Sequence, residues 1–427
     1  MQVSVRVLEG ENWSATVEGN AIKPTVGQGK ALLEVALTDN GRVVEVYRLT
    51  VALFVGEGTQ GQPYVIGSAD ALVALSERTN EGETFAGIYF ELTEDIDLGG
   101  VDYIRMAQFS GTLDGNGHTI RNMYLEYKGA NHLALIAVLT GTVRNLHVEG
   151  IVKKEMKTTD ANVNTQRIAG IVAANNGGLV ENCTFKGSII HTAEIKTPGA
   201  LDYVGGVVGQ NMSGGIIKGC AYLGSPDRQI YVDEAHVGGV VFQCDDGCYV
   251  IGCYNTGKIV TTKNTYSVGG VVGDMGDYGA AHIVGCYNTG IIVTEDGGYK
   301  YSRGGIIANN MHSGNTVTAC YNVTDGQSPN IYLIGYTSLQ APQATLFNTC
   351  YWVDVDGCQP FACGNLNENL AGSFTNCAAK TADELKSRTT VDALNAAIGT
   401  WNTVHNDLCN YRFAVDGAGG YPVLVEE

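Results

Sequence analysis

Hydrophobic and small residues recur at fixed positions in a segment that this chain repeats. The six residues GCYNTG occur at 252–257 and again at 285–290. With the cysteine as position zero, position −3 is aliphatic in five segments and position −1 is Asn, Gly or Ala. The aligned segments are VENC (180–183), IKGC (217–220), VIGC (250–253), IVGC (283–286) and VTAC (317–320). Because Asn and Gly tolerate the left-handed backbone region, position −1 predicts a tight bend between two inward-facing side chains.

The same frame extends to IRNM (120–123) and VRNL (143–146), and then to FNTC (347–350) and FTNC (374–377). Successive position-zero residues lie between 23 and 37 residues apart. The shortest interval suits one turn of a parallel β-helix, and longer intervals predict loops that leave at one corner. A single coil cannot bury its apolar residues, whereas a stack can. We therefore predict an all-β fold, a right-handed parallel β-helix of about nine coils with helical caps.

A paired-glycine motif precedes these segments. Its copies are IAGIVA (168–173), VGGVVG (204–209), VGGVVF (237–242), VGGVVG (268–273) and RGGIIA (303–308). The motif resembles the GLUG repeat of bacterial surface proteins, which is Gly, two aliphatic residues and Gly. Gly206–Gly209 and Gly270–Gly273 match it in full, whereas Ala173, Phe242 and Ala308 replace the last glycine.

The segments YFELTEDIDLGG (89–100) and FSGTLDGNGHTI (109–120) resemble the start of such pectate-lyase-like β-helices. The resemblance covers roughly residues 56–427. It implies a secreted or surface protein with a role in adhesion, and it supplies no established catalytic residues.

The two ends of the chain follow other patterns. Residues 1–55 alternate like antiparallel strands with DNG (39–41) as a hairpin turn, and they resemble a short Ig-like or cadherin-like module. Ser68 and Thr381 are placed as N-caps of amphipathic helices that would cover the ends of the solenoid. The predicted units are a small β-sandwich-like module at 1–55, the β-helix at 56–378, and a C-terminal helical cap with a final strand at 379–427.

Composition and charge restrict the partners. The 57 glycines and 8 prolines suit a strand-rich protein with many turns, and the net charge is −18. This charge excludes nucleic acid and anionic membranes as expected partners, because both need basic clusters. No apolar run reaches the about 18 residues of a membrane helix, and Met1 leads directly into an alternating strand pattern rather than a signal peptide. The resemblance implies an extracellular or cell-surface location, so we expect that an export signal and any membrane anchor lie outside this chain. We also expect a monomer.

Seven cysteines occupy position zero and predict a buried ladder of reduced thiols. They are Cys183, Cys220, Cys253, Cys286, Cys320, Cys350 and Cys377. In-register stacking holds neighbouring Cβ atoms about 4.8 Å apart, farther than the ~3.8 Å of a disulfide. Outside the ladder, CDDGC (244–248) and CQPFAC (358–363) would each allow a local disulfide. The two cysteines of CQPFAC and Cys409 would supply three zinc ligands, but the sequence offers no clear fourth one. We therefore expect no metal and no cofactor.

Tyrosines mark two candidate binding regions. Position +1 carries an outward row that would stack on sugar rings, unless loops fold over it and bury it: Tyr124, Tyr254, Tyr287, Tyr321 and Tyr351. The excess residues of the longer coils lie at 153–167, 188–203, 223–236, 258–267 and 291–302 and carry Tyr203, Tyr231, Tyr266, Tyr299 and Tyr301. Because loops on a rigid scaffold usually carry binding residues, we predict that these five loops form one surface with any ligand site.

Acidic residues suggest an alternative. The turn after each paired-glycine strand is polar: Asn175, Gln210, Asp245, Asp274 and Asn309. Asp245 and Asp274 on successive coils would be about 5 Å apart, as in a retaining glycosidase, but aspartates in turns usually bond to local backbone.

Three hypotheses follow from these patterns. The favoured one is a non-catalytic surface protein for adhesion, with a glycan or a host-cell protein as its ligand. The alternatives are a carbohydrate-active enzyme, a polysaccharide hydrolase or lyase that uses acids on the loop-bearing face, and a structural spacer whose 1–55 module is the binder.

Overall fold

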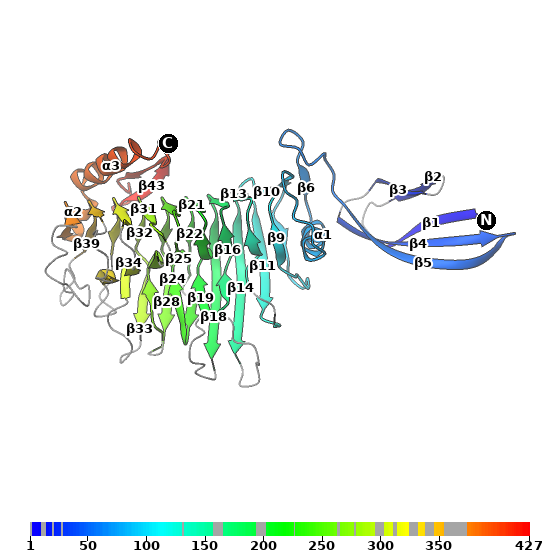
Figure 1. The fold of residues 1–427 in the computed structure, drawn as a ribbon, viewed down its shortest axis with the longest axis horizontal. Helices are drawn as coiled ribbons and strands as arrows, with labels where there is room; N and C mark the ends of the chain where they lie inside the picture. Colours follow the sequence, from blue (N-terminus) through cyan, green and yellow to red (C-terminus); the bar gives the residue numbers. More distant parts are fainter. Residues whose placement is uncertain are drawn as a thin grey trace.

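The computed structural model shows an all-β solenoid whose strands pair mostly in parallel (Figure 1). The described residues are 2–9, 14–18, 21–26, 29–129, 132–156, 165–193, 202–225, 227–262, 265–276, 279–294, 303–310, 314–323, 332–337, 346–353 and 374–427. Each coil contributes strands to three long sheets, numbered here in the order in which the chain meets them. This arrangement confirms the predicted fold class.

Sheet 1 carries positions −4 to −2 of the repeat and has eleven strands within the described residues. They are β6 (Tyr64–Ile66), β7 (Tyr89–Leu92), β10 (Thr112–Asp114), β13 (Thr142–Arg144), β17 (Leu179–Glu181), β21 (Ile216–Lys218), β26 (Tyr249–Ile251), β31 (His282–Val284), β35 (Thr316–Thr318), β38 (Leu346–Asn348) and β40 (Phe374–Thr375). Sheet 1 ends before position −1, where the chain turns into sheet 2.

Sheet 2 follows position zero and has thirteen strands within the described residues. They are β8 (Ile96–Asp97), β11 (Thr119–Glu126), β14 (His147–Met156), β18 (Thr184–Ala193), β22 (Ala221–Tyr222), β23 (Gln229–Val232), β27 (Tyr254–Asn255), β28 (Lys258–Thr261), β32 (Tyr287–Asn288), β33 (Ile292–Thr294), β36 (Tyr321–Asn322), β39 (Tyr351–Val353) and β41 (Ala378–Lys380).

Sheet 3 contains the paired-glycine motifs and has twelve strands within the described residues. They are β9 (Met106–Phe109), β12 (Ile136–Leu139), β15 (Arg167–Ala169), β16 (Val172–Asn176), β19 (Asp202–Gly205), β20 (Val208–Met212), β24 (Ala235–Gly238), β25 (Val241–Cys244), β29 (Val268–Gly269), β30 (Val272–Met275), β34 (Arg303–Asn310) and β37 (Tyr332–Thr337). In most coils the glycines divide the motif into two short strands.

The predicted bend at position −1 is confirmed. Every position −1 residue from the second coil of the frame onward has a positive φ: Asn145, Asn182, Gly219, Gly252, Gly285, Ala319, Thr349 and Asn376, with values between 51° and 66°. The bend lets positions −3 and zero both face the core. Val180 and Cys183, for example, are both fully buried.

The predicted alignment of IRNM (120–123) with the repeat was wrong. The number of coils also differs slightly from nine. Leu113, not Ile120, pairs with Val143 in sheet 1, whereas Ile120 pairs with Val148 in sheet 2. The turn DGNGH adds two residues between these strands, and Asn122 has a positive φ of 57° that imitates position −1. Two more strands, β6 and β7, precede β10 in the same sheet.

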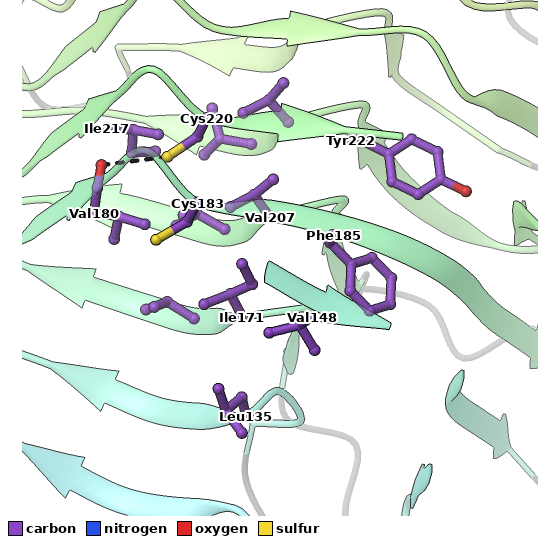
Figure 2. Close-up of a cluster of buried hydrophobic side chains, with 14 of the residues drawn as sticks. Leu135, Val148, Ile171, Val180, Cys183, Phe185, Val207, Ile217, Cys220 and Tyr222 are labelled. Atoms are coloured by element: carbon purple, nitrogen blue, oxygen red, sulfur yellow. Dashed lines mark hydrogen bonds between the residues drawn. The ribbon is translucent and has the colours of Figure 1, made fainter. Parts of the chain in front are cut away.

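The core is a continuous column of aliphatic, aromatic and thiol side chains. Figure 2 shows Cys183 and Cys220 one above the other in the cluster of buried side chains that includes Ile171 and Val207. Six of the seven ladder cysteines are fully buried, Cys377 is half-buried, and all seven are free thiols. Backbone N–H groups donate to the next thiol of the ladder, as from Cys220 to Cys253 at 3.4 Å. Burial raises the pKa of the Cys183, Cys253 and Cys286 thiols, which favours the protonated form.

Thiol titration tests the ladder. Without reductant, denatured protein should yield at least five free thiols from Cys183, Cys220, Cys253, Cys286 and Cys320, and the native protein should react far more slowly because these groups are buried. Recovery of no thiol after denaturation would contradict a ladder of reduced cysteines.

The local disulfide expected in CDDGC is not formed. Cys244 and Cys248 are free, buried thiols. The second cysteine pair, at 358 and 363, lies outside the described residues.

The N-terminal residues form two antiparallel units. One sheet has the order β1 (Gln2–Glu9), β4 (Gly29–Asp39) and β5 (Arg42–Leu53), and a hairpin joins β2 (Ser14–Glu18) to β3 (Ala21–Val26). Asn40 and Gly41 have φ values of 48° and 78° and form the predicted turn between β4 and β5. An Ig-like or cadherin-like relationship for this unit stays a prediction.

Helix α1 (Ala69–Asn80) lies beside the first coils at the N-terminal end of the solenoid (Figure 1). Ser68 is its N-cap, as predicted, because its Oγ accepts the Ala71 N–H at 3.1 Å. Leu72 and Leu75 are fully buried on one face. The helix therefore covers apolar side chains that the first coil would otherwise expose.

The C-terminal segment contains α2 (Ala382–Lys386), α3 (Arg388–Asn402), β42 (Tyr411–Ala414) and β43 (Val423–Glu426). The capping box of Thr381 and Glu384 is formed as predicted. However, α3 and β43 lie along the side of the coils rather than across their end (Figure 1). The side chain of Tyr411 packs against the glycines of position −1. A Cβ atom at Gly252 would be only 2.6 Å from the Tyr411 ring.

Candidate ligand-binding face

The tyrosines of position +1 form the expected stack, but the C-terminal segment covers it. The rings of Tyr254 and Tyr287 are nearly parallel, with centroids 4.8 Å apart. The rings of Tyr287 and Tyr321 are also nearly parallel, with centroids 5.0 Å apart. Tyr287 and Tyr321 are buried, and Tyr254 is partly buried. The Tyr321 hydroxyl donates to the Pro422 carbonyl, and its ring packs 5.6 Å from Phe413. The rings are thus covered as the alternative interpretation expected, although by the C-terminal segment rather than by loops.

A partly exposed row of side chains lies instead on the outer face of sheet 3. The paired-glycine motif creates it, because the residue before the buried Ile168, Val204 or Val237 must point outward in an alternating strand. These outward residues are in register across coils, Arg167 with Tyr203 and Tyr203 with His236. We call the set formed by Arg167, Tyr203, His236 and Tyr266 the aromatic row.

The members of the aromatic row contact one another in order. The Arg167 guanidinium lies 5.6 Å from the Tyr203 ring, and the Tyr203 and His236 centroids are 6.0 Å apart. Tyr266 continues the row at 5.8 Å from His236 and is 41% exposed. Phe242 supports the row from below, 4.7 Å from Tyr203 and 4.9 Å from His236. Burial lowers the pKa of His236 to about 4, so its ring is neutral at physiological pH.

A ladder of amide and acid side chains runs beside the aromatic row. The register pairs Gln210 with Gln243, Gln243 with Asp274, and Asp274 with Asn309. Gln210 accepts from Arg167 Nε at 2.7 Å and donates to Gln243 at 2.6 Å. Asn309 donates to Asp274 at 3.2 Å. We call these four residues the polar ladder, which Arg167 joins to the aromatic row.

The polar ladder corrects the predicted alignment of acids. Gln243, not Asp245, lies opposite Asp274, because the paired glycines fix the register and Asp245 falls two residues later. Asp245 is buried beyond the end of β25, where its N–H donates to the Asn211 carbonyl at 3.0 Å. Likewise Asn175 pairs with Asn211 rather than with Gln210. The predicted pair of opposed carboxylates is therefore not formed.

Three ionisable residues that sequence reasoning missed are buried where two predicted loops begin and end. Lys154 is in β14, His191 in β18 and Asp202 in β19, and their side chains are at most 4% exposed. The Asp202 carboxylate accepts from Lys154 Nζ, from His191 Nε2 at 2.8 Å and from the Gln166 N–H at 2.8 Å. Burial opposes ionisation of Asp202, but the hydrogen bond and charge of His191 and the charge of Lys154 outweigh it and hold its pKa below the usual value.

Other predicted loop residues are less informative. Tyr231 lies in β23 in register with Ile190 and Val260 and is partly buried. Tyr299 and Tyr301, and the middle of the loops at 157–164 and 194–201, lie outside the described residues. In the part of the chain that the structure describes, no three His, Cys, Asp or Glu residues are grouped so as to hold a metal ion. None of its helices is long and apolar enough to cross a membrane.

Comparisons with known proteins find similarity in sequence to one curated protein and in fold to several solved structures. No protein-family model matches the chain. The chain is 27% identical to halomucin of Haloquadratum walsbyi over 219 residues, which cover 48% of this chain but only 2% of halomucin. A Bacteroides ovatus structure described as a candidate immunoglobulin A1 protease is 17% identical with a TM-score of 0.44, covering 87% of this chain and 95% of that one. A structure described as an IgA1 protease is 16% identical with a TM-score of 0.47, covering 81% of this chain and 25% of that one.

Proposed function

We propose that this chain is a non-catalytic, glycan-binding solenoid of an exported surface protein. The observation that carries the proposal is the aromatic row with its adjoining polar ladder. Aromatic faces stack on the apolar faces of sugar rings, and the partly exposed Arg167 guanidinium can donate to hydroxyl groups. The polar ladder, of which Gln210, Gln243 and Asp274 are buried, holds Arg167 in place through Gln210. A row that repeats once per coil suits an extended oligosaccharide lying along the axis of the solenoid.

The chemistry of the polar ladder favours binding over hydrolysis. Glycosidases of both stereochemical classes use two carboxyl groups that flank the bond to be broken. The ladder has one carboxylate, Asp274, between the amides Gln243 and Asn309. The net charge of −18 favours a neutral glycan over a polyanionic one, because like charges repel. The resemblance of the paired-glycine motif to the GLUG repeat, which is associated with adhesion, and the similarity to part of halomucin both support a location on the cell surface.

Removal of rings from the aromatic row tests the proposal. The probe is a printed array of neutral and acidic oligosaccharides, and the affinity for the strongest neutral binder is then measured by titration. Tyr266→Ala should weaken binding about 3- to 10-fold and Tyr203→Ala/Tyr266→Ala about 10- to 100-fold, since a buried aromatic contact contributes roughly 0.5–1.5 kcal/mol beyond its area.

The matched control is Tyr47→Ala. Tyr47 is 47% exposed in β5, close to the 41% of Tyr266, but lies in the N-terminal unit. This variant should bind like the wild type, and thermal unfolding of all variants should stay close to that of the wild type. The proposal fails if no oligosaccharide binds, or if the double variant binds normally. Loss of binding on deletion of residues 1–55 alone would favour the spacer hypothesis instead.

A further inference from the structure

A pocket of about 400 Å³ lies in the first coils, apart from the residues considered so far. The segment between β8 and β9 forms one wall, and β11 with the turn after it forms the other. The side chains that matter are those of Asp102, Ile104, Arg105, Tyr124, Glu126 and Lys128. Its volume falls within the about 300–1,000 Å³ of small-molecule sites.

Two side chains with large apolar surfaces are exposed in this pocket. Tyr124 is 49% exposed and Ile104 is 52% exposed. The sequence frame aligned Tyr124 with the tyrosines of position +1, but its register partner on the next coil is Ile151, four residues after the true position +1 at His147. The C-terminal segment, which buries Tyr287 and Tyr321, does not bury this ring. Tyr124 therefore keeps a ring face that a sugar can stack on.

The polar side chains of the pocket balance in charge. Asp102 and Glu126 are acidic, whereas Arg105 and Lys128 are basic. Lys128 Nζ lies 3.6 Å from Asp102, and Glu126 lies 3.6 Å from Lys153 at the edge. A charged ligand would leave one of these pairs unmatched. A neutral ring with many hydroxyl groups matches all four, because each hydroxyl both donates and accepts.

The pocket is joined to the aromatic row through His132. Arg105 Nε donates to the His132 carbonyl at 2.8 Å, and the Arg167 N–H donates to His132 Nδ1 at 3.4 Å. Leu133, which lines the pocket, forms a β-bridge with Ile168 beside Arg167. Burial, with the nearby charges of Arg167 and Arg105, lowers the pKa of His132 to about 4, so this junction is neutral at pH 7. The pocket thus lies where the aromatic row begins.

We infer that this pocket is the terminal subsite of the glycan-binding face and receives one neutral hexopyranose, with Tyr124 stacked on the ring. The inference rests on the proposed function for its link to a longer glycan. It adds that the end of the chain, rather than its middle, sets specificity. The charge balance predicts that uronic acids and amino sugars bind more weakly than neutral hexoses.

Simple glycosides test the pocket without the aromatic row. The probes are the methyl pyranosides of glucose, galactose and mannose, with glucuronic acid and glucosamine as charged comparisons, each measured by saturation-transfer NMR. At least one neutral glycoside should bind, and Tyr124→Ala should weaken it at least about 10-fold, whereas the equally exposed control Tyr47→Ala should not. The pocket assignment is overturned if no neutral glycoside binds, if Tyr124→Ala binds normally, or if the charged sugars bind more tightly.

Oligosaccharide binding separates this inference from the proposed function. If both Tyr124→Ala and Tyr203→Ala/Tyr266→Ala weaken binding of the array-selected oligosaccharide, pocket and row form one site, as inferred. If only the row variant weakens it, the proposed function stands and the terminal subsite is refuted. If only Tyr124→Ala weakens it, the row proposal fails and with it the pocket's role as a terminal subsite.

Discussion

Replacing Gly239 by valine is expected to lower the free energy of unfolding by more than about 4 kcal/mol, or to prevent folding. A Cβ atom at Gly239 would lie 1.9 Å from the Gly270 carbonyl oxygen on the next coil. The same approach recurs from Gly206 to Gly239 and from Gly270 to Gly305, at 2.0 Å each. Relief of this overlap would require neighbouring coils to separate, which would break parallel hydrogen bonds on both sides of the bend.

Gly399→Ala is the matched control and should raise the free energy of unfolding slightly. Gly399 lies inside α3, and a Cβ atom there would meet nothing within 4 Å. Alanine in a helix interior is about 0.5–1 kcal/mol more favourable than glycine. Urea unfolding followed by circular dichroism measures both variants. Equal stability of Gly239→Val and the wild type would show that the coils are not stacked through these glycines.

Asp202→Asn is expected to lower the free energy of unfolding by about 3–5 kcal/mol, because it leaves the buried charge of Lys154 without its counter-ion. The double variant Lys154→Met/Asp202→Asn should recover part of this loss, since it removes both charges. A cost below about 1 kcal/mol for the single variant, in urea unfolding at pH 7, would contradict the buried ion cluster.

The effect of Asp202 should also depend on pH. Its pKa in the folded protein lies below the usual value, so its contribution is present above the unfolded pKa of about 3.9 and is lost as the pH falls through the folded value. The stability gap between the wild type and Asp202→Asn should therefore narrow as the pH falls below about 4. A stability gap that widens below about pH 4 would contradict a lowered pKa of Asp202 in the folded protein.

The repeating features of the fold were predictable because stacking demands them in every coil. Position −1 must bend and position zero must fit a narrow core, so Gly252 and Cys253 recur as Gly285 and Cys286. The frame failed at Ile120, where a two-residue insertion and the positive φ of Asn122 imitated the repeat. It failed again at Asp245, because polarity was used to align this turn, whereas the glycines set its register.

Features that depend on distant contacts were not predictable in the same way. Tyr411 bonds to Asn182 across 229 residues, and nothing in the local pattern of the C-terminal helix shows that it packs along the coils. Lys154 and Asp202 are 48 residues apart and meet only when the strands are in register. The aromatic row was found in part, through Tyr203 and Tyr266. Arg167 and His236 end two of the predicted loops, 153–167 and 223–236, but only tyrosines were singled out in these loops, so both residues were missed.

A crystal structure with the neutral oligosaccharide selected from the array tests the central claim most directly. The account predicts a sugar ring stacked on Tyr203 or Tyr266 of the aromatic row, with a hydroxyl group bonded to Arg167. A glycan bound only to the N-terminal unit, or on a face of the solenoid that has none of these residues, would contradict it.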